Sequence, residues 1–402
     1  MRKGRESRGL KLVAAALVAA GGLVAEEHVY LTGVPDYEWH SGCFGTACGN
    51  LIGFWDRHGF PDFYQGPTAG GVAPLNSAGI NRGIFALWES KAGRDGRPSG
   101  MPGHYEDYYV AYDSAAPDPY QVAGRPEHAP DCIGDFIGLN QRKWTNLAGE
   151  CDGNIDGYVF NYWDASGARR TNFRPGSEAG LPAIDLQSGL RDWAAHCGYE
   201  AEVFSQLSDF NPKVTTPGAG FSFTDVRAEI DAGYPLLVFL QNWNQLSRPE
   251  GEMPRANPEI HGMLIYGYYV DDAGTERVRV RTSWATGDYE FREWNSQTWT
   301  PSLGIFLPVR GVIGFRPAPK IVSARPDGNG GFELRWHGPQ AELFDVVAGE
   351  SRPAHQYVVE RASSLEPGDF TPVSPLLTER AWTVPACCPG TSFFRVRLVA
   401  GQ

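Results

Sequence analysis

The sequence predicts a mixed α+β domain followed by a small all-β domain. Apolar residues with helical spacing stand at 46–58 and 186–197, and strand-like runs begin at Pro235, His261 and Arg277. The letters DDAGTE between the last two runs are typical of a hairpin turn. Helices that precede an antiparallel sheet indicate the α+β class. Residues 317–320 are rich in proline and are followed by short runs of alternating polarity, which predicts a domain boundary there.

Three segments are predicted to be helices. The first runs from Thr46 to His58, is apolar throughout and has Gly59 at its C-cap position, so we expect a buried central helix. The second stops at Gly198 and carries its apolar residues on one face. These residues are Leu186, Leu190, Trp193, Ala194 and Cys197. The third runs from Thr224 to Gly233. Residues 60–180 are crowded with Gly, Pro and aromatic residues, which predicts long inserted loops and a candidate substrate-binding surface.

The C-terminal segment contains four short alternating runs, FELRW, YVVERA, AWTVPA and SFFRVRLV. Their number and a segment length of about 80 residues are typical of a β-sandwich of the immunoglobulin-like or fibronectin type III kind. We therefore divide the chain into a leader at 1–25, a main domain at 26–316 and a sandwich at 317–402. We expect residues from about 320 onward to fold independently.

The N-terminus has the layout of a secretory signal peptide. The basic letters MRKGRESRG precede an apolar run that ends in small residues before Glu26. An uncleaved membrane anchor is the alternative, but so short a run rich in Ala and Gly is marginal for spanning a bilayer. We predict cleavage between Ala25 and Glu26 and a secreted or cell-envelope protein of bacterial type.

The charge balance limits the partners of the mature protein. The whole chain carries a formal charge of -12, and removing residues 1–25, with five basic residues and one acidic residue, makes it -16. A surface this acidic, without a basic patch in the sequence, argues against nucleic acid or anionic lipid as a partner. We expect a monomer whose partner is a peptide or protein substrate, with the C-terminal domain as a contact to the cell envelope or matrix.

The chain has seven cysteines, an odd number. In an oxidising compartment at least one of them stays outside any intramolecular disulfide, and catalysis is one reason for such a thiol. Cys132 and Cys151 bracket a loop rich in Gly, Asn and Asp and are the best disulfide candidates. Cys387 and Cys388 are vicinal and cannot bond each other without strain.

Cys43 and His261 are the candidate catalytic pair. Cys43 stands at the head of the apolar helix in the run WHSGCFGTACGNLIGFWD, where the helix dipole favours the thiolate, the attacking form of cysteine. A buried, inert cysteine is an equally good interpretation of this run alone. His261 opens the strand-like run HGMLIYGYYV and supplies the base that a cysteine nucleophile needs, although a lone histidine is more often structural.

These two elements resemble those of the papain-like cysteine peptidases, in particular the bacteriocin-processing, double-glycine group and its secreted relatives. In that group a GC-x-P-T-A-like element opens the central helix and an H-A-M-x-x-x-G-Y-like element opens a sheet strand, and they stand here as GCFGTA and HGMLIYGY. The resemblance extends over about 230 residues with long insertions. It implies a papain-like fold with Cys43 as nucleophile and His261 as general base.

Two further roles are implied less directly. The family places an Asp or Asn that orients the imidazole where this chain has Thr282, and a hydroxyl stabilises an imidazolium less than a carboxylate does. Asp288 is an alternative orienter close in sequence. The oxyanion-stabilising Gln of the transporter-linked relatives corresponds to Tyr37, whose alternative role is packing. The N–H of Cys43 is the second expected oxyanion donor, and Gly45 replaces a proline of the family pattern.

The sequence predicts no cofactor and no metal site. The run DGNIDG from Asp152 starts like a calcium loop, but its twelfth position is Trp163, so the bidentate glutamate is missing. No histidine or cysteine spacing is typical of zinc. We therefore expect a secreted cysteine peptidase, with a binding module of the same fold that has lost activity as the alternative.

Overall fold

The structure is a computed structural model, and it describes a little under two thirds of the chain. The described residues are 25–40, 42–65, 72–88, 132–137, 162–175, 185–241, 260–284, 290–296, 299, 307–386 and 391–400. Several predicted features lie outside these ranges. They are residues 1–24 of the predicted leader, most of residues 60–180 with the DGNIDG run, Cys151, Asp288 and the vicinal cysteines. Cleavage of the leader and the pairing of Cys132 with Cys151 therefore stay predictions.

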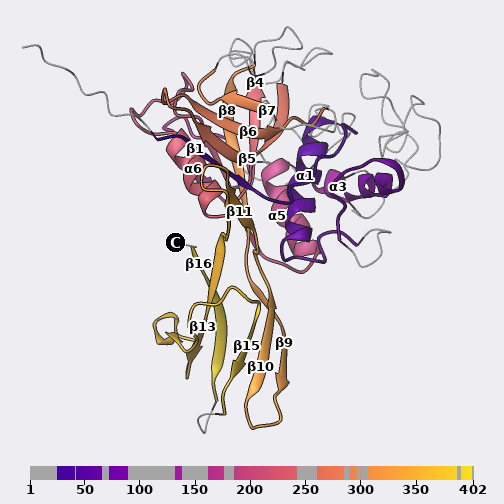
Figure 1. The fold of residues 1–402 in the computed structure, drawn as a ribbon, viewed down its shortest axis with the longest axis vertical. Coiled ribbons are helices and arrows are strands. Elements are labelled where there is room, and N and C mark those ends of the chain that lie inside the picture. The colour runs from indigo at the N-terminus through magenta and orange to yellow at the C-terminus, as the bar shows by residue number, and fades with distance from the viewer. Residues whose placement is uncertain are drawn as a thin grey trace, which may run out of the picture.

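One large antiparallel sheet forms the upper lobe of the molecule (Figure 1). Its main path runs β12-β11-β1-β5-β4-β8-β3-β2, and β6 and β7 extend it from β5. The strands are β1 (Glu27–Leu31), β2 (Arg170–Thr171), β3 (Ala201–Leu207), β4 (Leu236–Gln241), β5 (Ile260–Val270), β6 (Glu276–Arg281), β7 (Glu290–Glu293), β8 (Val309–Pro317), β11 (Glu342–Asp345) and β12 (Glu350–Pro353). Within the described residues every strand pairing is antiparallel, and the predicted α+β class is confirmed.

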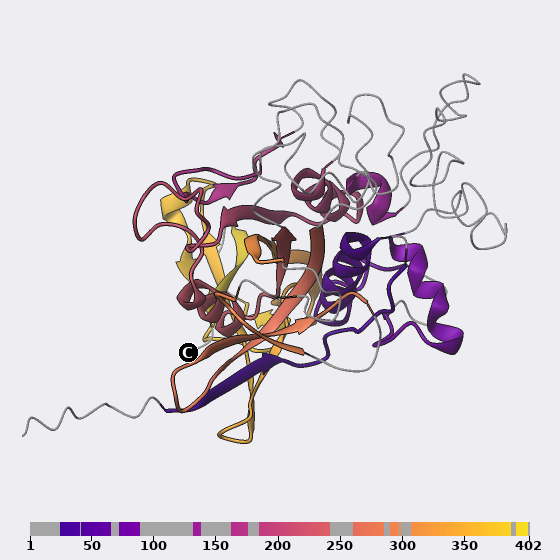
Figure 2. The ribbon, with the colours of Figure 1, turned by 90° about the horizontal axis from the view of Figure 1, so that it is seen from above.

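Helices cover both faces of this sheet. They are α1 (Cys43–Arg57), the 3-10 helix η1 (Gly79–Leu87), α3 (Ile133–Ile137), α5 (Leu186–His196) and α6 (Phe223–Asp231). Helix α1 contacts β5 and β4, and α5 contacts β3 and β8. Helix α6 lies on the other side of the sheet from α1 and α5 (Figures 1 and 2). Every residue of α1 from Cys43 to Asp56 is buried, which confirms the predicted buried helix and moves its start from Thr46 to Cys43.

The ends of the helices follow their sequence signals. Ser222 and Asp225 form a capping box at the start of α6, in which the Ser222 side chain accepts from the Asp225 N–H. Asp185 caps α5 by accepting from the Ser188 N–H at 2.8 Å. Gly59 follows α1 with φ +117°, a conformation that glycine adopts without strain. These residues explain where α5 and α6 start and where α1 ends.

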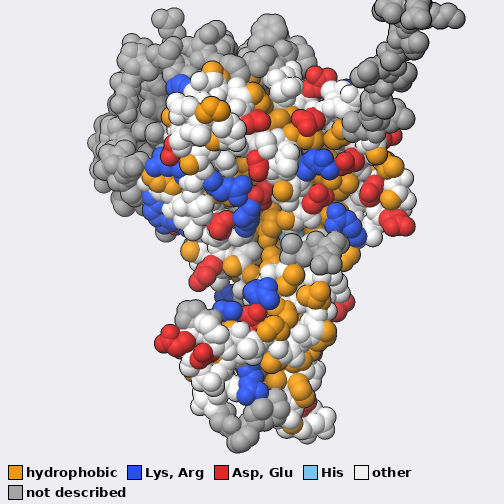
Figure 3. Space-filling view, turned by 90° about the vertical axis from the view of Figure 1, so that its left-hand side faces the viewer, with side chains coloured by type: hydrophobic (Ala, Val, Ile, Leu, Met, Phe, Trp, Pro, Cys, Tyr) orange, Lys and Arg blue, Asp and Glu red, His pale blue; other side chains and the backbone are white. Residues whose placement is uncertain are grey.

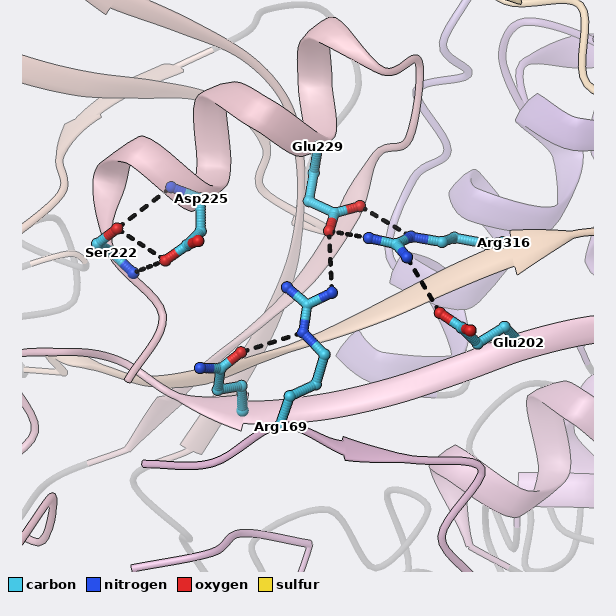
Figure 4. A network of polar contacts seen from close by, with 7 residues as sticks. Arg169, Glu202, Ser222, Asp225, Glu229 and Arg316 are labelled. Atoms are coloured by element: carbon cyan, nitrogen blue, oxygen red, sulfur yellow. Dashed lines mark hydrogen bonds and ion pairs between the residues drawn. The ribbon is translucent and has the colours of Figure 1, made fainter. Parts of the chain in front are cut away.

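A buried carboxylate ties α6 to the sheet (Figure 4). Glu229 of α6 is 5% exposed and pairs with Arg316 of β8 and with Arg169, which stands just before β2. The Arg316 guanidinium also donates to Glu202 of β3 at 3.0 Å. Because two arginines neutralise Glu229, its burial against the sheet is compensated.

We expect Glu229→Gln to lower the free energy of unfolding by about 3 kcal/mol, because it leaves the half-buried Arg169 and Arg316 without their shared carboxylate. Glu202→Gln is the matched control. Its carboxylate pairs with the same Arg316 but is 44% exposed, so the expected loss is under about 1 kcal/mol. Urea unfolding of both variants measures the difference, and equal losses would contradict the assigned role of Glu229.

The C-terminal region forms a second, smaller lobe of two three-stranded sheets (Figure 1). One sheet contains β15, β10 and β9, and the other contains β14, β13 and β16. Their bounds are β9 (Lys320–Pro326), β10 (Phe332–His337), β13 (His355–Ala362), β14 (Thr371–Pro372), β15 (Ala381–Val384) and β16 (Phe393–Ala400). Side chains from both sheets, including Trp336 of β10 and Tyr357 of β13, share one apolar core. The four strands predicted from the alternating runs are confirmed.

The predicted boundary at residue 317 does not separate two structural units. The hairpin β11–β12 leaves the small lobe and joins the main sheet, where Leu343 of β11 is opposite Leu31 of β1. Leu343 is fully buried in the core of the upper lobe, and Leu398 of β16 packs against both cores. Figure 3 shows hydrophobic side chains gathered at the waist between the lobes and down one side of the small lobe. The apolar contacts therefore continue from one lobe into the other.

In the part of the chain that the structure describes, no helix is both long and apolar enough to span a bilayer.

Candidate active site

Cys43 is the first residue of α1. Gly42 precedes it with φ 108°, a backbone conformation that glycine permits. The Thr46 hydroxyl accepts from the His40 N–H at 3.1 Å and donates to the Gly42 carbonyl at 3.0 Å. The Trp88 indole donates to the His40 carbonyl at 2.8 Å. These bonds fix the turn before α1, so Cys43 lies at the N-terminus of α1, where the helix dipole favours negative charge.

His261 lies on β5 next to the first turn of α1. The ring of Phe44, the residue after Cys43, packs against Gly262, the residue after His261. A Cβ on Gly262 would lie only 2.4 Å from Cδ1 of that ring. Figures 1 and 2 show α1 lying along the sheet at this place. The structure thus brings together the two segments of the predicted catalytic pair, although 218 positions separate them in the chain.

The imidazole of His261 is held by one hydrogen bond and one stacking contact. Its Nε2 lies 2.6 Å from the backbone carbonyl of Thr282, and its ring stacks on Trp284 with centroids 4.1 Å apart and an interplanar angle of 7°. A carbonyl only accepts, so Nε2 carries the proton and Nδ1 carries the lone pair. Among the described residues Nδ1 is buried without a hydrogen-bond partner. The ring is therefore held as the tautomer whose Nδ1 is available as a base.

Burial lowers the pKa of His261 to about 4, and the hydrogen bond to the Thr282 carbonyl opposes this shift only in part. The side chain is 1% exposed, and desolvation disfavours the charged imidazolium. His261 is therefore neutral at pH 7, which is the form that accepts a proton. No carboxylate contacts the ring within the described residues, so the imidazolium formed in a reaction lacks the charged partner that the family pattern supplies.

Thr282 lies beside His261, as the sequence predicts, but it contacts the ring through its backbone. The Thr282 hydroxyl accepts from the Trp284 N–H at 3.4 Å, and the carbonyl is the group that meets Nε2. Ser283, between Thr282 and Trp284, has φ +58°, which is uncommon for a residue with a side chain. Such backbone outliers concentrate at functional sites. The predicted side-chain orienter is thus corrected to a main-chain one, while Asp288 lies outside the described residues.

Tyr37 is not near the nucleophile. Its hydroxyl donates to the Pro74 carbonyl at 2.7 Å and lies 2.6 Å from the position of a Cβ on Gly53. Gly53 is ten residues beyond Cys43, which is about 15 Å along a helix. The ring is fully buried and stacks on Trp88. The oxyanion role predicted for Tyr37 is corrected to a packing role, because the hydroxyl donates to the Pro74 carbonyl and lies beside a turn of α1 far from Cys43.

Two tryptophans flank the site and were not singled out from the sequence. Trp284 covers His261, and its carbonyl accepts from the Trp39 N–H at 3.2 Å. Trp39 is 44% exposed and Trp284 is 40% exposed. Trp39 stands four residues before Cys43, so the segments that lead into the nucleophile and away from the base meet here. The only sequence signal for these flanking tryptophans was the position of an aromatic residue two places after Thr282.

No metal is indicated at this site. Within the described ranges, no group of three His, Cys, Asp or Glu side chains is placed to hold a metal ion.

Comparison with known proteins adds no family assignment. A scan against protein-family models finds no match, and searches of the curated proteins and of the solved structures find no match either. The functional argument therefore depends on the geometry around Cys43 and His261.

Proposed function

We propose that the protein is a cysteine peptidase of papain-like architecture, in which Cys43 is the nucleophile and His261 is the general base. The observation that carries the proposal is the state of His261. Its Nε2 is committed to the Thr282 carbonyl, its Nδ1 is buried and available, and its strand packs against the first turn of α1 through Phe44 and Gly262. A cysteine at a helix N-terminus next to an oriented imidazole is the arrangement that nucleophilic thiol catalysis needs.

In this mechanism Nδ1 of His261 takes the proton of the Cys43 thiol as the sulfur attacks the peptide carbonyl. The N–H groups of the first turn of α1 stabilise the oxyanion of the tetrahedral intermediate. The imidazolium then gives its proton to the leaving amine, and a thioester remains on Cys43. Water, deprotonated by the same nitrogen, attacks the thioester, releases the acid product and restores the thiol.

A binding module without activity is the second candidate, and the burial of both groups favours it. Cys43 is 8% exposed and His261 is 1% exposed, and the acceptor on Nε2 is a neutral carbonyl. Both features make an ion pair of thiolate and imidazolium less stable than it is with a carboxylate orienter. The two candidates differ in one property, the chemical reactivity of Cys43.

Alkylation with iodoacetamide at pH 7 tests this property. We expect Cys43 to react at least about tenfold faster than Cys48 and Cys197, because a thiol at a helix N-terminus is activated. Cys48, in the same helix, is the matched control. Burial raises the pKa of the Cys48 thiol far above its usual range and raises the pKa of Cys197 to about 12. Mass spectrometry of the folded protein gives the three rates, and equal rates would favour the binding module.

The hydrogen bond to a main-chain carbonyl predicts a mild phenotype for Thr282. We expect Thr282→Ala to change kcat/KM by less than about threefold, because the carbonyl on Nε2 is retained. For the same reason Thr282→Asp is not expected to raise activity, because the contact to the ring comes from the backbone and not from the side chain. Steady-state kinetics on a peptide substrate checks both variants. A loss of two orders of magnitude in Thr282→Ala would show that the hydroxyl itself takes part.

A further inference from the structure

A pocket lies at the junction of the two lobes, at the end of α1 opposite Cys43. Its volume is about 470 Å³, within the usual range for a small-molecule site. Arg57 and Gly59, at the end of α1, line it from the upper lobe, and Arg335, Trp336 and Arg380 line it from the small lobe. Arg57 stands fourteen residues after Cys43, which is about 21 Å along a helix. The pocket is therefore separate from the candidate active site.

Three arginines line the pocket, and they differ in how they are paired. Arg335 is paired with Glu333 at 2.8 Å. Arg57 and Arg380 donate to backbone carbonyls, of Ala73 at 2.6 Å and of Gly59 at 2.9 Å. Among the described residues neither of these two has a carboxylate within ion-pair distance. The Nε of Arg57 is also buried without a partner. Two guanidinium groups, one from each lobe, thus retain donors and charge for an anion.

The two acidic residues of the lining do not cancel this charge. Asp56 accepts from the N–H groups of Tyr64 and Ala73 at 2.9 and 2.7 Å, so its oxygens are occupied. Burial raises the pKa of Asp56 to about 7, against the effect of these hydrogen bonds and of Arg57, so its charge at neutral pH is partial. Glu379 is exposed to solvent, where its charge is screened.

Other lining groups indicate the rest of the ligand. Trp336 is 2% exposed, and its indole N–H is buried without a partner in the described part of the chain. Val72 and Val322 also line the pocket and are 49% and 44% exposed. The pocket therefore combines cationic donors with an apolar surface.

We propose that this pocket binds a small organic anion, with a carboxylate held by Arg57 and Arg380 and an apolar portion against Val72 and Val322. Because the two arginines belong to different lobes, the ligand fixes the small lobe against the end of α1. Inorganic phosphate offers similar oxygens to the arginines but has no apolar portion. Comparing its affinity with that of an organic carboxylate therefore shows whether the pocket selects the apolar portion or binds any oxyanion. The proposal does not depend on peptidase activity.

Thermal unfolding of the full chain tests the proposal, with hexanoate, acetate and inorganic phosphate as probes at constant ionic strength. We expect hexanoate to raise Tm saturably, by about 3 °C at a hundred times Kd. We expect acetate to bind at least about tenfold more weakly, because it lacks the methylene groups that contact the valines. Absence of a saturable rise with hexanoate would overturn the proposal. Equal affinity for phosphate would overturn its apolar part.

Variants locate the site. Arg57→Gln and Arg380→Gln are each expected to weaken hexanoate binding by at least about tenfold. Val322→Asp introduces a negative charge at the rim and is expected to abolish binding without disturbing either core, because Val322 is exposed. Arg352→Gln, which removes an exposed arginine paired with Asp231 on the upper lobe, is the control with unchanged binding. Unchanged binding in Val322→Asp and in both pocket arginine variants would place the anion elsewhere.

Discussion

His261→Ala is expected to lower kcat/KM for a peptide substrate by about 10²- to 10⁴-fold, the range for losing a positioned general base. The ring lies on β5 next to the first turn of α1 and has an available buried lone pair on Nδ1. His196→Ala is the control. His196 is an exposed histidine in the last turn of α5, and we expect its replacement to leave kcat/KM unchanged. Retention of activity in His261→Ala would end the peptidase proposal.

The pH profile adds a readout that a merely structural role of His261 would not affect. Burial lowers the pKa of His261 to about 4, so the base stays neutral, and kcat/KM stays high, well below the ordinary value near 6.5. The acid limb should therefore lie near pH 4. Trp284→Ala removes the stacked ring that covers His261, and returning water to the imidazole should move the acid limb upward, towards pH 6.5. An unmoved limb in Trp284→Ala would show that another group sets it.

Local sequence signals were sufficient for the central elements of the fold. The apolar run after Cys43 and the capping glycine at 59 predict a buried helix, and the turn signal from Asp271 to Gly274 predicts the β5–β6 hairpin. That hairpin brings residues near Thr282 to His261. Such contacts join residues that are close together in the sequence, so their geometry follows from the helix period and the strand register.

The errors concern contacts that local patterns do not encode. Tyr37 stands six residues before Cys43 in the sequence, but this spacing does not reveal that its side chain lies beside Gly53, further along α1. Residue type suggested a hydroxyl orienter at Thr282, but the orienting group is a carbonyl, which every residue has. The residue type at position 282 therefore says little about how His261 is oriented.

The small lobe shows that local patterns also fail to predict contacts between segments that lie far apart in the chain. Strand β11 has the letters ELFD and pairs with β1, which lies more than 300 positions earlier in the chain. So short a run has no clear period, and nothing nearby reveals its partner. Alternating strands after residue 317 thus predict a lobe correctly but hide the hairpin that joins it to the main sheet.

A chain that ends after Pro317 is expected to lose the folded state of the upper lobe, although the sequence predicts that residues from about 320 onward fold independently. Truncation removes β11 and β12 and leaves β1 as an unpaired edge of the main sheet. It also removes His355, whose ring packs on Trp55 of α1 and on Tyr234. We expect the truncated chain to aggregate on expression, as shown by gel filtration and circular dichroism. A monomeric product with native Tm would contradict this expectation.

Point substitutions separate the role of the hairpin from that of the small lobe. Leu343→Ala in β11 should lower the free energy of unfolding of the upper lobe by about 3 kcal/mol, because its side chain is fully buried in that core. Leu334→Ala in β10 is the matched control, since Leu334 is 3% exposed within the core of the small lobe. We expect it to destabilise that lobe first and to leave the inactivation temperature of the proposed peptidase activity closer to that of the wild type. If Leu343→Ala has the smaller effect on inactivation, the β1–β11 pairing does not stabilise the upper lobe.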